Sequence, residues 1–146
     1  MIKVLFICHG NICRSPMGEF ILKEMVKKRG LAERFEIASA AVSTEEIGNP
    51  VYPPARRELA KHGIRCDGHA AHRITRRELD HYDRIYYMDR SNARWLERLF
   101  PGIWQEKCRP FWTGMWRTPG TREILHRPTT TLWKAAREFW RNYAES

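Results

Sequence analysis

An apolar run near the N-terminus, Val4 to Ile7, ends abruptly in a polar loop that leads into a helix-forming segment. Four consecutive apolar residues are typical of a strand buried on both faces of a parallel sheet. The segment from Pro16 to Arg29 has helical content, and proline is favoured in the first turn of a helix. The sequence therefore predicts a strand, a loop and a helix in direct succession.

The loop itself, residues 8–15, reads CHGNICRS and combines a cysteine, a glycine and an arginine. Gly10 permits a turn, and backbone N–H groups at the start of the following helix can surround an anion. Arg14 adds a planar guanidinium that can bind two phosphate oxygens at once. The same positive field should favour the thiolate form of Cys8, with the Ser15 hydroxyl as a candidate donor to its sulfur. This combination indicates phosphoryl transfer to sulfur.

Five residues separate Cys8 from Arg14, which is the spacing of cysteine-dependent phosphatases. In its full form, CHGNICRSP after an N-terminal strand, the segment resembles the low-molecular-weight protein tyrosine phosphatase family; the alternative is a structural cysteine near an unrelated arginine. The resemblance runs from Met1 to about Gly102. It implies that Cys8 is the nucleophile and that Arg14 stabilises the transition state, with Asn11 and Ser15 in support. The phosphate-binding residues that it implies are His9, Gly10, Asn11, Ile12, Cys13, Arg14 and Ser15.

The remaining pattern alternates strands and helices. Strands are predicted at Phe35–Ser39, Tyr82–Met88 and Cys108–Trp112, and helices at Ala55–His62 and Asn92–Phe100. With an anion-binding loop after the first strand, this order indicates an α/β, doubly wound parallel sheet. The family resemblance implies four parallel strands with flavodoxin-like topology, and we expect a single phosphatase domain over residues 1–146.

A long loop, Val42 to Pro54, follows the second predicted strand, and such loops commonly carry binding residues in α/β folds. In the resembled family this region forms a wall of the active-site mouth and affects substrate choice. Tyr52 is its candidate aromatic contact, or a tyrosine packed under its own loop. Farther along, His69 falls where the family has a histidine that hydrogen-bonds the loop asparagine, here Asn11; the alternative is a surface histidine.

The resembled family carries its general acid as an aspartate in an Asp-Pro pair on a late loop, where it protonates the departing tyrosine oxygen. No Asp-Pro pair occurs in this sequence, and no aspartate follows Asp89. Asp89 itself stands at the end of a predicted strand, which favours a helix cap or loop brace over a catalytic acid. The sequence therefore leaves the general acid unidentified.

The composition changes after Gly102, because five of the six tryptophans lie between Trp104 and Trp140. Shifting the codons by one base from Trp104 onward lets residues 123–125 encode Asp-Pro, so we hypothesise that a frameshift near Gly102 produced this tail. Read as written, residues 103–146 form an atypical and least ordered segment, with a substitute helix near 130–143. Glu123, the acid of its central stretch, is not assigned as a proton donor.

The four cysteines suggest a reducing compartment. Cys8, Cys13, Cys66 and Cys108 show no CxxC spacing, so neither a disulfide scaffold nor a zinc site is expected, and we expect no cofactor. Cys13 could form a reversible disulfide with an oxidised Cys8, or could simply be a small packed residue. We expect a cytoplasmic protein, since Met1-Ile2-Lys3 leads directly into a strand rather than a signal peptide.

The function predicted is hydrolysis of phosphotyrosine in proteins, and of small aryl phosphates, through a cysteinyl phosphate, with phosphate or other oxyanions as active-site ligands. One alternative is an acid-deficient phosphotyrosine-binding module. Another is a thiol-dependent arsenate reductase, although Cys66 and Cys108 form no evident relay pair.

The net charge of +9 is distributed among acids, as in Arg56-Arg57-Glu58, so we expect no nucleic-acid partner. The same charge could attract acidic phosphoproteins. No apolar run approaches the length that spans a bilayer, so we expect no membrane partner.

Overall fold

The computed structural model describes residues 1–111. These residues form a four-stranded sheet in the order β2-β1-β3-β4, and every strand pair is parallel. The strands are β1 (Ile2–Cys8), β2 (Phe35–Ala41), β3 (Arg84–Tyr87) and β4 (Cys108–Pro110). The helices are α1 (Arg14–Lys28), α2 (Pro53–Lys61), α3 (Arg76–His81) and α4 (Arg90–Leu99), with 3-10 turns η1 (Ala32–Arg34) and η2 (Trp104–Glu106). The predicted α/β fold is confirmed.

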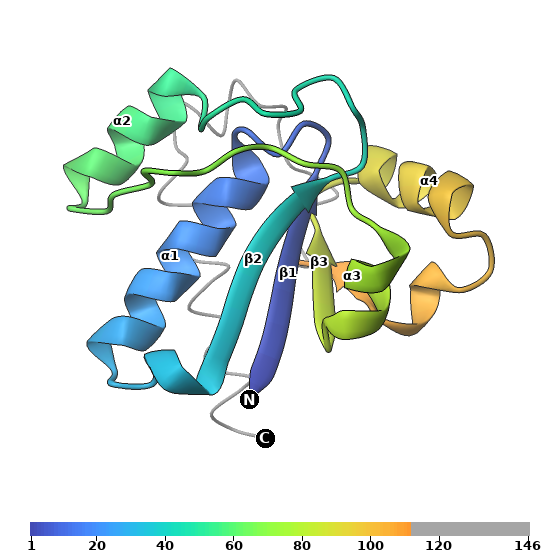
Figure 1. Cartoon of the computed structure of the whole chain (residues 1–146), viewed down its shortest axis with the longest axis horizontal. Coiled ribbons are helices and arrows are strands. Elements are labelled where there is room, and N and C mark those ends of the chain that lie inside the picture. Colours follow the sequence, from blue (N-terminus) through green and yellow to red (C-terminus); the bar gives the residue numbers. More distant parts are fainter. Residues whose placement is uncertain (112–146) are drawn as a thin grey trace.

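Helices cover both faces of the sheet, as a doubly wound fold requires. In Figure 1, α1 and α2 lie on one side of the sheet, and α3 and α4 lie on the other. The chain passes from β1 to β2 on one side and then crosses to β3 on the other, so the strand order reverses at β1. Ligands of such folds bind beyond the carboxyl ends of the strands at this reversal. The loop after β1 occupies that place.

The apolar run that predicted the first strand forms the centre of the core. Val4, Leu5, Phe6 and Ile7 have no exposed surface. Helix α1 packs closely on this strand at Gly18, where a Cβ would lie 3.2 Å from a ring carbon of Phe6. The helix starts at Arg14, two residues before the predicted start, so Arg14 and Ser15 belong to its first turn.

Helix α3 was not predicted from the sequence. Its six residues are too few to show an apolar period, but Thr75 and Glu78 form a reciprocal capping box at its N-terminus. The last strand is confirmed for Cys108–Pro110. The predictions for Trp112, Glu123 and a helix near 130–143 lie outside the described residues.

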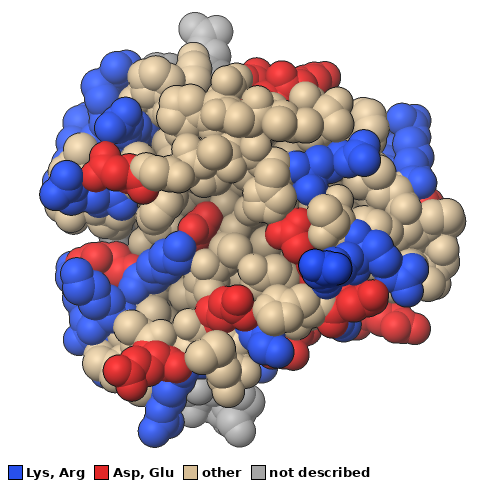
Figure 2. Space-filling view, viewed as in Figure 1, with Lys and Arg blue, Asp and Glu red and all other residues tan. Residues whose placement is uncertain are grey.

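Charged side chains of both signs are interspersed over the face of the molecule shown in Figure 2. Several basic residues are paired with acids, including Lys61 with Glu58 at 2.8 Å and Arg76 with Asp80 at 3.1 Å. Within residues 1–111, no helix combines the length and the apolar character needed to cross a bilayer.

Candidate active site

The loop that joins β1 to α1 holds the nucleophile candidate and the arginine at its two ends. Cys8 is the last residue of β1 and is 3% exposed, and Arg14 is the first residue of α1 and is 8% exposed. Asn11 has a φ of 60°, the one positive φ of a non-glycine residue in the described part of the chain. Asparagine tolerates this left-handed conformation because its short side chain hydrogen-bonds locally.

Gly10 does not form the left-handed turn of the loop, although the sequence suggested a turn at this residue. Its φ is not positive, and a Cβ there would lie 3.1 Å from Cγ of Glu46. Glycine at this position therefore allows the loop to approach Glu46 closely, and the left-handed turn falls on Asn11 instead.

Two hydrogen-bond donors are directed at the sulfur of Cys8. The backbone N–H of Asn11 lies 3.3 Å from the sulfur, and the Ser15 hydroxyl lies 3.0 Å from it. The Ser15 oxygen in turn accepts a hydrogen bond from the side-chain amide of Asn11, at 2.9 Å. The sequence-based pairing of Ser15 with Cys8 is thus reproduced in the structure, and Asn11 adds a second contact.

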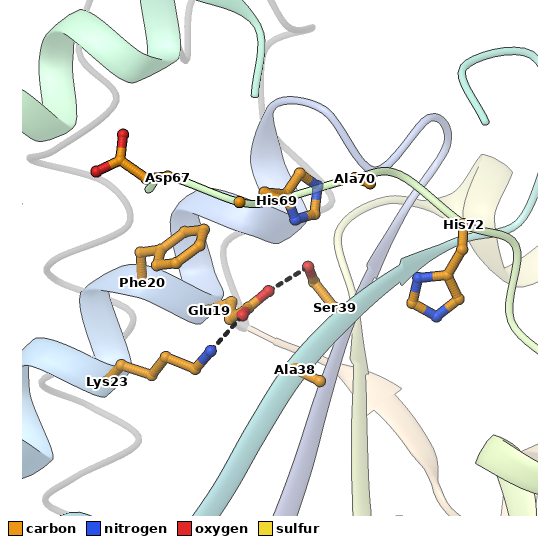
Figure 3. Close-up of a pocket in the computed structure, with 10 residues that line it drawn as sticks. Glu19, Phe20, Lys23, Ala38, Ser39, Asp67, His69, Ala70 and His72 are labelled. Carbon is orange, nitrogen blue, oxygen red and sulfur yellow. Dashed lines mark hydrogen bonds and ion pairs between the residues drawn. The ribbon is translucent and has the colours of Figure 1, made fainter. Parts of the chain in front are cut away.

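A buried carboxylate sets the direction of these hydrogen bonds. Glu19 is 7% exposed and lies 2.5 Å from the Ser39 hydroxyl on one side and 2.5 Å from the Lys23 ammonium on the other (Figure 3). A carboxylate only accepts hydrogen bonds, so the Ser39 hydroxyl must donate to Glu19. Ser39 then accepts from the second N–H of the Asn11 amide, at 2.9 Å.

This direction reaches the Cys8 sulfur through Ser15. The Asn11 amide donates to Ser15, so the hydroxyl hydrogen of Ser15 is free to point elsewhere. Its two acceptors are the Cys8 sulfur at 3.0 Å and the Ala40 carbonyl at 3.5 Å, and the shorter contact favours the sulfur. Glu19 therefore indirectly positions a donor at Cys8, a role that sequence reasoning missed because Glu19 resembles an ordinary helix residue.

Two histidines hold Asn11 from the opposite side. The His69 ring nitrogen Nε2 lies 2.7 Å from the Asn11 carbonyl oxygen, so Nε2 carries the hydrogen. The backbone N–H of His72 donates to the Asn11 side-chain oxygen at 3.3 Å. The expected contact between His69 and Asn11 is therefore present, to the backbone of Asn11. Both histidines also line a pocket of about 290 Å³ behind the loop (Figure 3).

Asp89 is the carboxylate that orients Arg14. Its side chain accepts from the backbone N–H of Asn92 in a capping box at the start of α4, which confirms the predicted helix cap. Its other oxygen lies 2.6 Å from Nη1 of Arg14. One guanidinium nitrogen is thereby held in place. No local sequence signal predicts this pair, because 75 residues separate its members.

The wall beside the loop is formed by the segment after β2. The backbone N–H of Ser43 donates to the His9 carbonyl at 3.1 Å, and that of Tyr52 donates to the Ile12 carbonyl at 2.7 Å. His9 also pairs with Glu45 at 3.0 Å. The Tyr52 side chain is 39% exposed, so it is not packed beneath its own loop.

Cys13 is the second thiol of the loop. Burial raises its pKa to about 12, with a further increase from the charge of Cys8 and an opposing effect of Arg14. A resolving thiol must ionise to attack, so this pKa opposes a disulfide with Cys8. Oxidation of Cys8 to a neutral sulfenic acid removes the Cys8 charge, which is one of the two causes that raise the Cys13 pKa. The disulfide stays a prediction, tested by peroxide treatment and thiol mapping.

Alkaline pH should destabilise the fold through its buried thiols. Burial raises the pKa of both Cys13 and Cys108 to about 12, against 9.0 for the reference thiol. Above pH 9.0 the unfolded chain loses these protons while the folded chain keeps them, so the free energy of unfolding should fall as pH rises toward 12. Urea unfolding at neutral pH and in alkali measures this slope, and the double variant Cys13→Ala/Cys108→Ala should flatten it.

Replacing Glu19 should weaken the hydrogen bonding to the Cys8 sulfur without removing the sulfur. In Glu19→Gln the side chain can donate as well as accept, so the direction of the hydrogen bonds to Ser15 is no longer fixed. We expect kcat on an aryl phosphate to fall about tenfold, with a changed pH profile of kcat/KM. The control is Glu24→Gln, which removes a partner of Lys28 on the same helix. Equal activity of the two variants would contradict this role of Glu19.

The described residues contain no group of three or more His, Cys, Asp or Glu side chains arranged to hold a metal ion. What the loop, Arg14 and the directed donors can do chemically is to bind a tetrahedral oxyanion beside a sulfur nucleophile.

Comparison with known proteins is consistent with this geometry. The family model described as low molecular weight phosphotyrosine protein phosphatase matches residues 3–111. The match includes β4 and so extends past Gly102, where the resemblance was expected to end.

Relatives occur in bacteria and eukaryotes. The low molecular weight protein-tyrosine-phosphatase YfkJ of Bacillus subtilis is 41% identical over 92 residues, 63% of this chain and 59% of the relative. The low molecular weight phosphotyrosine protein phosphatase of Schizosaccharomyces pombe is 37% identical over 128 residues, 87% of this chain and 80% of the relative. The match thus spans about three fifths of the Bacillus relative.

Two solved structures share the fold. The crystal structure of YfkJ superposes with a TM-score of 0.90 at 26% identity, covering 99% of this chain and 96% of that one. The phosphatase SP-PTP of Streptococcus pyogenes gives a TM-score of 0.87 at 29% identity, covering 97% and 93%. The family model matches residues 3–111, which is most of this chain. Together with the relatives and solved structures, this match shows that the chain belongs to the low molecular weight phosphotyrosine protein phosphatase family.

Proposed function

We propose that this chain is a protein tyrosine phosphatase that hydrolyses phosphotyrosine, and small aryl phosphates, through a cysteinyl phosphate. The observation that carries the proposal is the pair of donors directed at the Cys8 sulfur, within a loop that also ends in Arg14. A sulfur held this way beside an anion-binding helix start is suited to attack a phosphate ester.

The phosphoryl group would be bound by the backbone N–H groups of residues 9–15 and by Arg14. Because Asp89 holds one nitrogen of the Arg14 guanidinium, the orientation of the group is restrained and its other N–H groups can donate to two phosphate oxygens. These donors stabilise the charge that moves onto the equatorial oxygens in the transition state.

The reaction has two steps. The Cys8 sulfur attacks phosphorus, the S–P bond forms, and the bond from phosphorus to the tyrosine oxygen breaks while that oxygen takes a proton. Water then attacks phosphorus, the S–P bond breaks, and inorganic phosphate leaves with the sulfur restored. The proton of the first step must come from an acid, and the family's Asp-Pro pair is missing from this sequence.

A comparison of leaving groups tests both the activity and the acid. We expect para-nitrophenyl phosphate to be hydrolysed, because its leaving group departs without protonation. A general acid contributes on the order of a hundredfold for a poor leaving group such as the tyrosine oxygen. Measured kcat for both substrates with the full chain therefore decides whether another residue supplies the proton.

Three results are informative. Similar kcat values would mean that an acid is present, and hydrolysis of para-nitrophenyl phosphate alone would mean that the acid is missing. Hydrolysis of neither, with retained affinity for phosphotyrosine, would support the binding module and contradict the enzyme.

Arsenate reduction is disfavoured because burial raises the pKa of Cys108 to about 12, which makes it a poor relay thiol.

A cytoplasmic location belongs to this proposal and is supported by four unpaired cysteines.

A further inference from the structure

A second pocket lies beside the candidate active site, between the loop after β2 and the ends of two helices. Its volume is about 480 Å³, which is room for one or two side chains. The residues that line it are Thr44, Ile47, Arg73, Ile74, Thr75, Arg76, Leu99 and Phe100. None of these residues has a part in the catalytic arrangement described above.

The pocket has an apolar wall that is partly open to solvent. Ile74 and Phe100 are buried beneath it, at 3% and 8% exposed, whereas the Ile47 side chain above it is 57% exposed. Among the described residues, the large apolar side chains that stand out in solvent are Met1, Ile47 and Tyr52. Two of these three lie in the loop that borders the active site, and exposed apolar surface in such a place indicates contact with another molecule.

Arg73 gives the pocket a positive charge. Its side chain is exposed, and within residues 1–111 no acidic side chain pairs with it. The neighbouring Arg76 is paired with Asp80. The acids of the bordering loop are engaged elsewhere, since Glu45 bonds His9 and Glu46 bonds Asn49. Among the described residues, none occupies Arg73, which leaves it to pair with a carboxylate of another molecule.

The position of Arg73 relative to the nucleophile follows from the strand register. Cys8 pairs with Ala41 across β1 and β2, and Ala41 forms a parallel bridge with Arg73 on its other side. The segment that carries Arg73 crosses the carboxyl end of β2 between α2 and α3 (Figure 1). Two strand spacings of about 4.8 Å place the Arg73 backbone roughly 10 Å from Cys8, which an extended peptide spans in about three residues.

We propose that this pocket is a subsite for phosphotyrosine proteins in which an apolar residue lies about three residues from the phosphotyrosine and an acidic residue lies two positions farther along. In an extended peptide these two side chains point to the same side. The apolar side chain packs against Ile47 and Leu99, and the carboxylate pairs with Arg73. This proposal rests on the proposed function, because it selects among substrates of the same active site.

Phosphotyrosine peptides of equal length provide the test. One pair carries leucine three residues before or after the phosphotyrosine, with glutamate two positions beyond the leucine, and a second pair carries lysine in place of that glutamate. For the wild-type chain we expect kcat/KM to be about three- to tenfold higher with glutamate than with lysine on one of the two sides. High salt should reduce this ratio, because the pair is exposed.

The variant Arg73→Glu should reverse the preference, and Ile47→Asp should lower kcat/KM for the leucine peptides. Arg77→Glu is the matched control, since Arg77 is an exposed arginine on α3 that does not line the pocket. It should keep the wild-type ratio. All three variants should hydrolyse para-nitrophenyl phosphate as the wild type does, because this small substrate does not reach the pocket.

The subsite would be overturned if Arg73→Glu and Arg77→Glu had the same ratio of kcat/KM between the glutamate and lysine peptides. The subsite would also be overturned if the mass of the wild-type chain in solution rose with concentration and only Arg73→Glu abolished the rise. A second copy of the chain would then be the occupant of the pocket. If the wild type fails on para-nitrophenyl phosphate, the proposed function fails instead. Fluorescence polarisation of the same peptides on Cys8→Ser then still measures the pocket, and equal affinities would exclude it.

Discussion

Replacement of Cys8 by serine should abolish turnover. The hydroxyl keeps the shape of the site, but it is a far weaker nucleophile than a sulfur that receives hydrogen bonds from Ser15 and from the Asn11 backbone. Loss of a nucleophile that forms a covalent intermediate costs on the order of 10⁴-fold or more in kcat. The measurement is the initial rate on para-nitrophenyl phosphate.

Binding separates loss of chemistry from loss of the fold. Phosphate affinity of Cys8→Ser, measured by calorimetry, should remain close to that of the wild type, because the backbone donors and Arg14 are unchanged. Cys66→Ser is the matched control, since Cys66 is also a buried, unpaired cysteine but lies outside the loop. Residual turnover of Cys8→Ser near the wild-type rate would refute the assignment of the nucleophile.

The second large effect is expected at Arg14. In Arg14→Lys the charge is kept, and an ammonium can still pair with Asp89, but it cannot present two parallel N–H groups to the phosphate. Removal of one preorganised donor to a transition state typically costs about 10²–10³-fold in kcat. We expect a loss of this size in kcat for para-nitrophenyl phosphate.

Two variants locate the cause of that loss. Arg94→Lys makes the same exchange on the exposed side of α4 and should leave kcat unchanged. Asp89→Asn keeps the guanidinium but weakens its orientation, so its loss should be smaller than that of Arg14→Lys. If Arg14→Lys retained wild-type kcat, Arg14 would serve the fold through Asp89 rather than bind phosphate.

The sequence also left part of the proton chemistry open. It shows that an Asp-Pro pair is missing, and the frameshift hypothesis for the tail predicts that the family's acid was lost with it. Sequencing the source DNA through the Gly102 junction, together with the intact mass of the native protein, tests that hypothesis.

The sequence by itself determined the β1–loop–α1 unit, because its signals are local. An apolar run predicts the strand, and the Cys8–Arg14 spacing with the following proline predicts an anion loop at a helix start. The helix cap at Asp89 was equally local, since a cap depends on residues within one turn.

Only the tertiary structure decided how the site is supported and what surrounds it. The pair of Arg14 with Asp89, the path from Glu19 through Ser39 and Asn11, and the pocket that Arg73 lines with apolar side chains join residues on different elements. Such contacts leave no periodic or spacing signal, because they arise when separate strands bring their ends to one edge of the sheet. The short helix α3 was missed for a related reason, since six residues are stabilised by a capping box and packing rather than by an apolar period.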